Sequence, residues 1–178
     1  CVPGLESVLQ SECHALGFHA GSQNSEETEG SAAILGERGG VQFSGTVEQV
    51  MLGNLHLRTA SRILIRFAEF YAAAFSELDK KTARLDWARF LTPGKPVNIR
   101  VTCHKSKLYH SDAVAERVLN SINRALTGSN GVKKPVHNSK DGQTVMVRLV
   151  HDLCTISIDS SGELLHRRGY HLETAKAP

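Results

Sequence analysis

The chain is arranged around the segment His104-Lys105-Ser106-Lys107-Leu108-Tyr109-His110-Ser111, which joins a predicted strand to a predicted helix. Residues 97–103 alternate apolar and other side chains, which is typical of a half-buried strand. Ser111 stands at the predicted N-cap of the helix, and Gly128 stands at its end. The buried stripe of that helix is predicted from apolar residues at four-residue spacing, namely Val114, Val118, Ile122 and Leu126.

The loop between this strand and this helix is basic and aromatic. Lys105 and Lys107 bring positive charge, and Tyr109 offers a ring on which a base can stack. Free backbone N–H groups and the positive end of the helix dipole also favour a phosphate at this place. Two interpretations stay open from the residues alone: a phosphate-binding loop, or a solvated basic loop on the surface.

The composition is that of an ordinary globular protein with an uneven charge. Its 178 residues are enough for one substantial domain or two small ones, and 40% of them are hydrophobic. The net charge of +3 is concentrated in residues 93–178, where 13 Lys and Arg face 7 Asp and Glu. Residues 1–92 are acidic, with 8 against 11. A basic half beside an acidic half indicates a polyanionic partner on one side of the molecule.

The four cysteines lie far apart and form no CxxC pair. We interpret Cys13, Cys103 and Cys154 as small core residues in a reducing compartment, not as disulfide partners or zinc ligands. No apolar run reaches the roughly 18 residues of a membrane-spanning helix. We therefore expect a cytoplasmic protein with no metal site and no membrane partner.

The first part of the chain, residues 1–74, predicts a ferredoxin-like domain. Thr46 and Gln49 form a capping box at the start of a helix. A strand restored before Pro3, and another between residues 18 and 38, would complete the order βαββαβ. The other predicted elements are helices at 3–16 and 46–59 and strands at 39–45 and 63–67.

A second unit, residues 75–165, is predicted to be α/β. Ser76 is the expected cap of a helix that runs to about residue 90, with Leu78, Leu85 and Trp87 as its apolar anchors. After the central strand, loop and helix, residues 145–150 and 153–158 form a β-hairpin around His151-Asp152. The predicted fold class is therefore α+β, and residues 166–178 remain as a linker.

Catalytic motifs are missing from this sequence. It contains no Walker A motif, GxGxxG after a strand, HExxH or GxSxG. Ser160 and Ser161 lie near His166, but serines at a strand end are ordinary turn residues, so a Ser/His/Asp site is disfavoured. The residues favour a binding module over an enzyme, and we predict no catalytic residue in this chain.

Several phrases, in order, resemble those of the bacterial THUMP-containing RNA methyltransferases, which are similar to the 23S rRNA guanine-N(2) methyltransferases. The matching phrases cover nearly the whole chain apart from residues 21–33. They are Pro3-Gly4-Leu5-Glu6, Gly39-Gly40-Val41-Gln42-Phe43, Leu57-Arg58-Thr59-Ala60-Ser61-Arg62, Lys105-Ser106-Lys107-Leu108-Tyr109-His110 and Asp159-Ser160-Ser161-Gly162-Glu163-Leu164-Leu165-His166-Arg167-Arg168-Gly169-Tyr170.

This resemblance implies a ferredoxin-like domain followed by an α/β THUMP domain that binds RNA. In the family, these domains deliver a guanine to a C-terminal domain, which methylates its exocyclic amine with S-adenosylmethionine. That domain is expected in cis after residue 178, and no cofactor is expected in this chain. The resemblance implies rRNA more than tRNA as the partner, with RNA contacts from Lys105, Lys107, Tyr109, His110 and Arg148. For Arg167 and Arg168 two roles stay open: RNA contacts, or packing of the linker toward the missing domain.

Two alternatives stay open beside this RNA-binding hypothesis. One is a protein-interaction or scaffold module that binds no RNA. The other is a small-molecule enzyme on a ferredoxin-like fold, which would need a pocket with a strongly perturbed acid or base.

Overall fold

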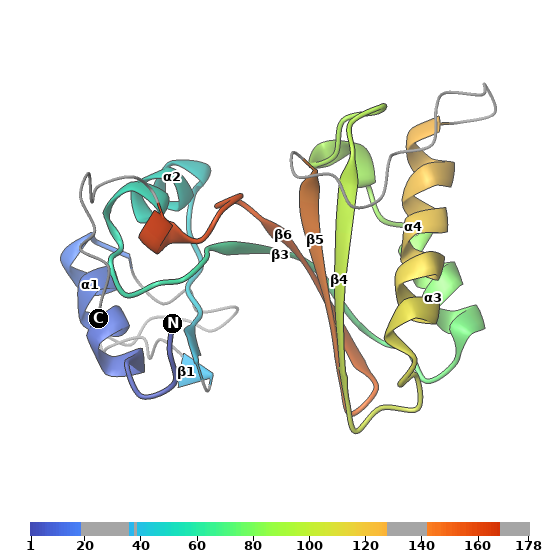
Figure 1. Cartoon of the computed structure of the whole chain (residues 1–178), viewed down its shortest axis with the longest axis horizontal. Helices are drawn as coiled ribbons and strands as arrows, with labels where there is room; N and C mark the ends of the chain where they lie inside the picture. Colours follow the sequence, from blue (N-terminus) through green and yellow to red (C-terminus); the bar gives the residue numbers. More distant parts are fainter. Residues whose placement is uncertain (19–35, 38, 128–141, 168–178) are drawn as a thin grey trace, which may run out of the picture. The chain divides into compact units, whose positions relative to one another are not determined.

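The computed structural model describes residues 1–18, 36–37, 39–127 and 142–167 (Figure 1). The chain divides into two compact units. The first consists of Cys1–Ile63 together with Ser160–Pro178, and the second consists of Leu64–Asp159. The domain boundaries predicted after residues 74 and 165 remain predictions.

The second unit is built on a four-stranded sheet with the order β3-β6-β5-β4. Strands β4 (Val97–His104) and β5 (Gln143–Val150) are parallel, whereas β6 (Leu153–Asp159) is antiparallel to both β5 and β3 (Leu64–Tyr71). The parallel pair needs a crossover, which α4 (Ser111–Thr127) provides, and the antiparallel pair β5–β6 forms the predicted hairpin. The strand and helix on either side of the central loop are thus confirmed.

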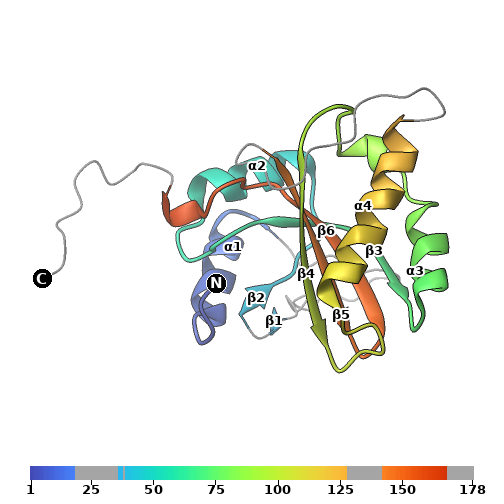
Figure 2. The same ribbon diagram turned by 45° about the vertical axis from the view of Figure 1, so that its right-hand side comes forward.

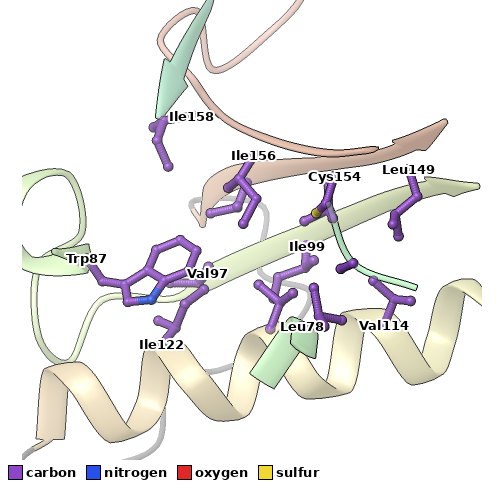
Figure 3. Packing of buried hydrophobic residues seen from close by; sticks show 14 of the residues in the cluster. Leu78, Trp87, Val97, Ile99, Val114, Ile122, Leu149, Cys154, Ile156 and Ile158 are labelled. Atoms are coloured by element: carbon purple, nitrogen blue, oxygen red, sulfur yellow. The ribbon is translucent and has the colours of Figure 1, made fainter. Parts of the chain in front are cut away.

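Helices α3 (Phe75–Thr82) and α4 lie on the same side of this sheet (Figure 1). The predicted stripe of α4 is confirmed, because Val114, Val118 and Ile122 are fully buried. They belong to one buried cluster with alternate residues of the strands, including Leu149 and Ile156. Figure 3 shows Val114 and Ile122 on the side of the helix that faces these strands. Burying one such aliphatic side chain contributes about 1.5–3 kcal/mol, so this face of the sheet holds the main core of the unit.

The helix predicted from residue 76 to about residue 90 was wrong in extent. Helix α3 ends at Thr82, and only a short 3₁₀ turn, Trp87–Arg89, follows. After Thr82 the ladder tightens, because the Thr82 carbonyl accepts the N–H of Leu85, three residues on, over 3.3 Å. The same carbonyl accepts the N–H of the buried Trp87 indole over 2.9 Å, and a buried indole N–H needs such a partner.

The predicted helix caps also differ by one or two residues. The N-cap of α3 is Ala74, and the Glu77 carboxylate accepts the Ala73 backbone N–H over 2.9 Å, so Ser76 makes no cap. Helix α4 starts at Ser111 itself, and the His110 carbonyl already accepts the Val114 N–H. Helix ends commonly shift by this amount between a sequence pattern and the hydrogen-bond ladder.

The first unit contains α1 (Glu6–Ala15), a short hairpin of β1 (Gly36–Glu37) and β2 (Gly40–Val41), and α2 (Val47–His56). The capping box of Thr46 and Gln49 is confirmed. Helix α2 packs closely at Gly53, where a Cβ atom would stand 2.8 Å from Ile63 Cδ1. The core of this unit is formed by Leu9, Cys13, Phe18, Leu57, Ala60, Ile63 and Leu165.

The strand predicted at 63–67 belongs to the other unit, which corrects the predicted βαββαβ order. From Leu64 to Tyr71 it pairs with β6, so its partners are Leu153–Asp159. Strand periodicity identifies a strand but not the neighbour with which it pairs, and this explains the error. Of the predicted strand at 39–45, Gly40–Val41 is strand; the strand expected between residues 18 and 38 falls mostly outside the described residues.

Candidate nucleic-acid interface

The loop between β4 and α4 is held by the β5–β6 turn at the same end of the sheet (Figure 2). The Lys107 N–H donates to Asp152 Oδ1 over 2.7 Å, and the Asp152 N–H donates to Ser106 Oγ over 3.0 Å. Ser106 Oγ in turn donates to the His104 carbonyl over 3.1 Å, which also accepts the His151 N–H. These bonds fix the course of the loop backbone without using the lysine ammonium groups.

Three residues of this end of the sheet adopt left-handed backbone conformations. Lys105 has φ 48°, and the turn residues His151 and Asp152 have φ 49° and 65°. The two turn residues match a tight hairpin turn of the primed type, in which both central residues have positive φ. For Lys105 the conformation costs about 1 kcal/mol or more, because its Cβ crowds the following carbonyl. The chain therefore holds a lysine in a place that glycine or asparagine would occupy more easily.

The side chains of the loop point outward. Lys105, Lys107 and His110 are exposed, and Tyr109 is 67% exposed, whereas Leu108 is buried and anchors the loop in the core. The Tyr109 ring lies against the His110 ring, with centroids 4.1 Å apart. Among the described residues, no ion pair is found that involves Lys105 or Lys107. The structure thus brings together the four predicted contacts of this loop.

The three predicted arginines lie elsewhere. Arg148 is exposed in the middle of β5, opposite Thr102 and Thr155 in the sheet register. Arg167 is exposed in the short turn Leu165–Arg167 of the first unit. Arg168 lies outside the described residues.

Sequence reasoning missed Arg100 of β4, which is exposed and lies on the strand next to Arg148. The signal was present in the alternation of β4, where Arg100, Thr102 and His104 are exposed between less exposed apolar residues. This alternation by itself predicts a strand and does not identify Arg100 as a contact residue.

Ser160 and Ser161 serve the backbone, which removes the basis for a Ser/His/Asp site. Ser161 Oγ accepts the Ile63 N–H and donates to Asn54 Oδ1, each over 2.8 Å. Ser160 Oγ donates to the Ile63 carbonyl over 2.9 Å and accepts from Asn54 Nδ2. These hydroxyls tie the segment that enters β3 to the segment that leaves β6.

The segment from Leu57 to Arg62, which precedes β3, is also held by hydrogen bonds to other parts of the first unit. An Arg62 guanidinium N–H donates to the Gly162 carbonyl over 2.7 Å, which is a structural role. The Glu12 carboxylate accepts the backbone N–H groups of Arg58 and Thr59 and the Thr59 hydroxyl. Partial burial raises the pKa of Glu12, but these hydrogen bonds outweigh it and lower the pKa below its ordinary value.

The described residues offer no metal site and no membrane span. Among them, no group of three or more His, Cys, Asp or Glu side chains is placed to hold an ion. No helix in this part of the chain is long and apolar enough to cross a bilayer. The buried thiol of Cys154 is inert as a ligand or nucleophile, because burial raises its pKa to about 12.

The β4–α4 connection is where a strand-to-helix turn would hold a nucleoside cofactor such as S-adenosylmethionine. Such turns are rich in glycine, because the backbone must approach the ligand closely. Residues 105–110 contain no glycine and present Lys105, Lys107 and Tyr109 instead. These residues fit a polyanion and do not fit that cofactor.

Two family models match the chain. Residues 1–64 match the RlmL ferredoxin-like domain, and residues 72–159 match the THUMP domain. Among curated relatives, the ribosomal RNA large subunit methyltransferase K/L of Methylococcus capsulatus (strain ATCC 33009 / NCIMB 11132 / Bath) is 31% identical over 175 residues. That match covers 98% of this chain but 22% of the relative.

Solved structures show the same partial coverage. A predicted N6-adenine-specific DNA methylase from Listeria monocytogenes str. 4b F2365 superposes with a TM-score of 0.79 at 28% identity, covering 100% of this chain and 43% of that one. SMU.472, a putative methyltransferase complexed with SAH, gives 0.77 at 27% identity, with coverage of 97% and 43%. The chain therefore spans less than half the length of these proteins.

Proposed function

Because the chain consists of an RlmL-type ferredoxin-like domain followed by a THUMP domain, we propose that it is the RNA-binding part of an RNA methyltransferase. In this proposal it positions structured RNA for guanine-N(2) methylation by a catalytic domain in the longer protein. That domain would use S-adenosylmethionine, the RNA is rRNA in preference to tRNA, and the protein works in the cytoplasm. The named relative acts on ribosomal RNA, which supports this choice.

The observation that carries the proposal is the β4–α4 loop. Its backbone is bound to the β5–β6 turn, and Lys105 and Lys107 are exposed beside the exposed ring of Tyr109. Two cations on a fixed backbone bind phosphates with little loss of conformational entropy. An exposed tyrosine at the same place supplies a surface for base stacking, worth about 1–3 kcal/mol per base.

The test is RNA binding by the whole chain and a charge-reversal pair, Lys105→Glu with Lys107→Glu. The probe is a fluorescently labelled RNA hairpin with a single-stranded tail, titrated between about 50 and 200 mM salt. Each phosphate contact to a single strand contributes a factor of about 5 at 0.1 M salt, so the Kd should rise about 25-fold or more. The slope of log Kd against log salt should fall by about 1.4.

A matched control reverses two exposed cations on the helical side of the same unit, Lys80→Glu with Arg84→Glu. This pair changes the net charge by the same amount as the Lys105/Lys107 pair. It should leave the Kd within about twofold of wild type, because salt screens the long-range effect of charge on binding. Equal losses in both pairs would mean that only net charge matters and that the loop is not the site.

The alternative of a protein-interaction module without RNA binding has one observation in its favour. Helix α2 exposes Val47, Met51 and Leu55 on the side away from its buried Gly53. A surface helix that is apolar on both sides is unusual. A wild-type chain that fails to bind any RNA at low salt would favour this alternative over the proposal.

A further inference from the structure

The face of the four-stranded sheet opposite α3 and α4 carries polar side chains from each strand, with the exposed Leu64 and Tyr71 at the two ends of β3. In β4, Val97 and Ile99 are buried, whereas Arg100, Thr102 and His104 are exposed. In β5, Arg148 is exposed between the buried Val147 and Leu149. Because side chains alternate between the two faces of a sheet, the exposed residues share the face that the helices leave open.

The register places these side chains in two rows across the sheet. Arg100 pairs with Met146, which pairs with Ser157, which pairs with Arg66. The next row runs from Thr102 through Arg148 and Thr155 to Glu69. Thr155 Oγ1 donates to Glu69 Oε2 over 3.3 Å, which confirms that both side chains stand on this face.

The positive charge of this face is concentrated on β4 and β5. On β3, Glu69 forms an ion pair with Arg66 over 3.2 Å, so these two charges largely cancel. Asp159, at the far end of β6, is only 2% exposed. Arg100 and Arg148 are exposed cations on β4 and β5, the half of the face that leads to the central loop.

The two arginines are suitably spaced for one nucleic-acid strand. They lie on adjacent strands, one step apart diagonally, so their Cα atoms are separated by about 7–8 Å. From Arg100 to His104 the strand rises about 13 Å, and Lys105 follows directly. The cations of the sheet and those of the loop therefore form a continuous stripe along β4, defined by Arg100, Arg148, His104, Lys105 and Lys107.

We propose that the sugar-phosphate backbone of the bound RNA continues from the loop onto this open face. Arg100 and Arg148 bind successive phosphates, and the hydroxyls of Thr102 and Thr155 reach ribose or phosphate oxygens. Arginine suits this role because its planar fork binds phosphate in a bidentate manner. This inference rests on the proposed function and names the path of the RNA within it.

The chemistry of the two central rows favours a backbone over bases or a protein. These rows contain no aromatic ring on which a base could stack, and their apolar side chain, Met146, is only partly exposed. The exposed ring of Tyr71 lies one row further on, at the end of β3. Protein interfaces require a desolvated apolar or aromatic centre, which these rows lack. Guanidinium and hydroxyl groups, which these rows do offer, are among the groups that contact phosphate and sugar.

The experiment neutralises both arginines, Arg100→Gln with Arg148→Gln, in the whole chain, and measures binding of the labelled RNA hairpin against salt. We expect the Kd to rise about 25-fold at 0.1 M salt and the salt slope to fall by about 1.4. A charge-keeping pair, Arg100→Lys with Arg148→Lys, should retain most of the slope while losing part of the affinity. The control pair Lys80→Gln with Arg84→Gln should leave both quantities unchanged.

The outcomes separate this inference from the proposed function. If wild type binds RNA and the Lys105/Lys107 pair impairs binding, but the Arg100/Arg148 pair does not, the path along the sheet is wrong and the loop site stands. If wild type binds no RNA at low salt, the proposed function fails and this inference with it. Thermal unfolding of each variant checks that these exposed substitutions leave the fold intact.

Discussion

The bond between Asp152 and the central loop gives the most informative perturbation, Asp152→Ala. The carboxylate accepts the Lys107 N–H over 2.7 Å, and Asp152 itself holds φ 65° in the β5–β6 turn. Alanine removes the acceptor and is poorly suited to the left-handed conformation, which Asp and Asn tolerate. The substitution should therefore loosen the loop and destabilise the turn together.

The size of the loss follows from these two terms. A hydrogen bond to an ionised group contributes about 1.5–3 kcal/mol, and partial exposure of Asp152 favours the lower end. The left-handed backbone adds about 1 kcal/mol for alanine. Asp152→Ala should lower the free energy of unfolding by about 2–3 kcal/mol, measured by urea denaturation of the whole chain.

Asp152→Asn is the matched control, because it removes the same charge but keeps an acceptor oxygen and a tolerated backbone. It should cost only about 1 kcal/mol of unfolding free energy. Removing a negative charge near the lysines favours RNA equally in both variants, so their difference reports the order of the loop. Asp152→Ala should bind the RNA hairpin about fivefold more weakly than Asp152→Asn, which corresponds to about 1 kcal/mol of ordering entropy.

Equal stability and equal RNA affinity of these two variants would contradict this role of Asp152. The loop would then hold its course without the carboxylate, and its order would not contribute to binding.

Three further predictions concern the side chains of Trp87, Glu12 and Cys154. Trp87→Phe leaves the Thr82 carbonyl without its indole donor and should cost about 1–3 kcal/mol, measured by urea denaturation. The pKa of Glu12 is lowered from 4.5 in the folded chain, so its stabilisation is complete at neutral pH and is lost as the pH falls below that value. Glu12→Gln should accordingly show a shallower loss of stability than wild type between about pH 5 and pH 3. With its pKa raised to about 12, the Cys154 thiol should resist alkylation at neutral pH in the native chain and react only after denaturation, as thiol mass labelling of wild type and Cys154→Ser would show.

Local periodicity predicted most of the second unit correctly. The stripe of Val114, Val118 and Ile122 and the alternation in β5 and β6 are strong signals, because a single buried face imposes them. The capping box of Thr46 and Gln49 was predicted equally well from the sequence. Two features could not be predicted from periodicity. One is the pairing of the strand Leu64–Tyr71 with β6, and the other is the end of α3 at Thr82, whose carbonyl accepts the Trp87 indole N–H.

The candidate site was predictable only as a list of residue types. The sequence placed Lys105, Lys107 and Tyr109 in one loop, but nothing in it showed that Asp152 would hold that loop through its backbone. Arg148 was named without its neighbour Arg100, because the two meet only through the register of β4 and β5. Contacts between segments that are distant in sequence carry this information, and periodicity does not.

Photo-crosslinking tests, without altering the protein, whether RNA lies against the β4–α4 loop. Wild-type chain is irradiated with an RNA hairpin that carries a photoreactive base, and the linked peptides are identified by mass spectrometry. We predict crosslinks at Tyr109 and its neighbours in the loop. Crosslinks confined to the helical side, around Lys80 and Arg84, would contradict it.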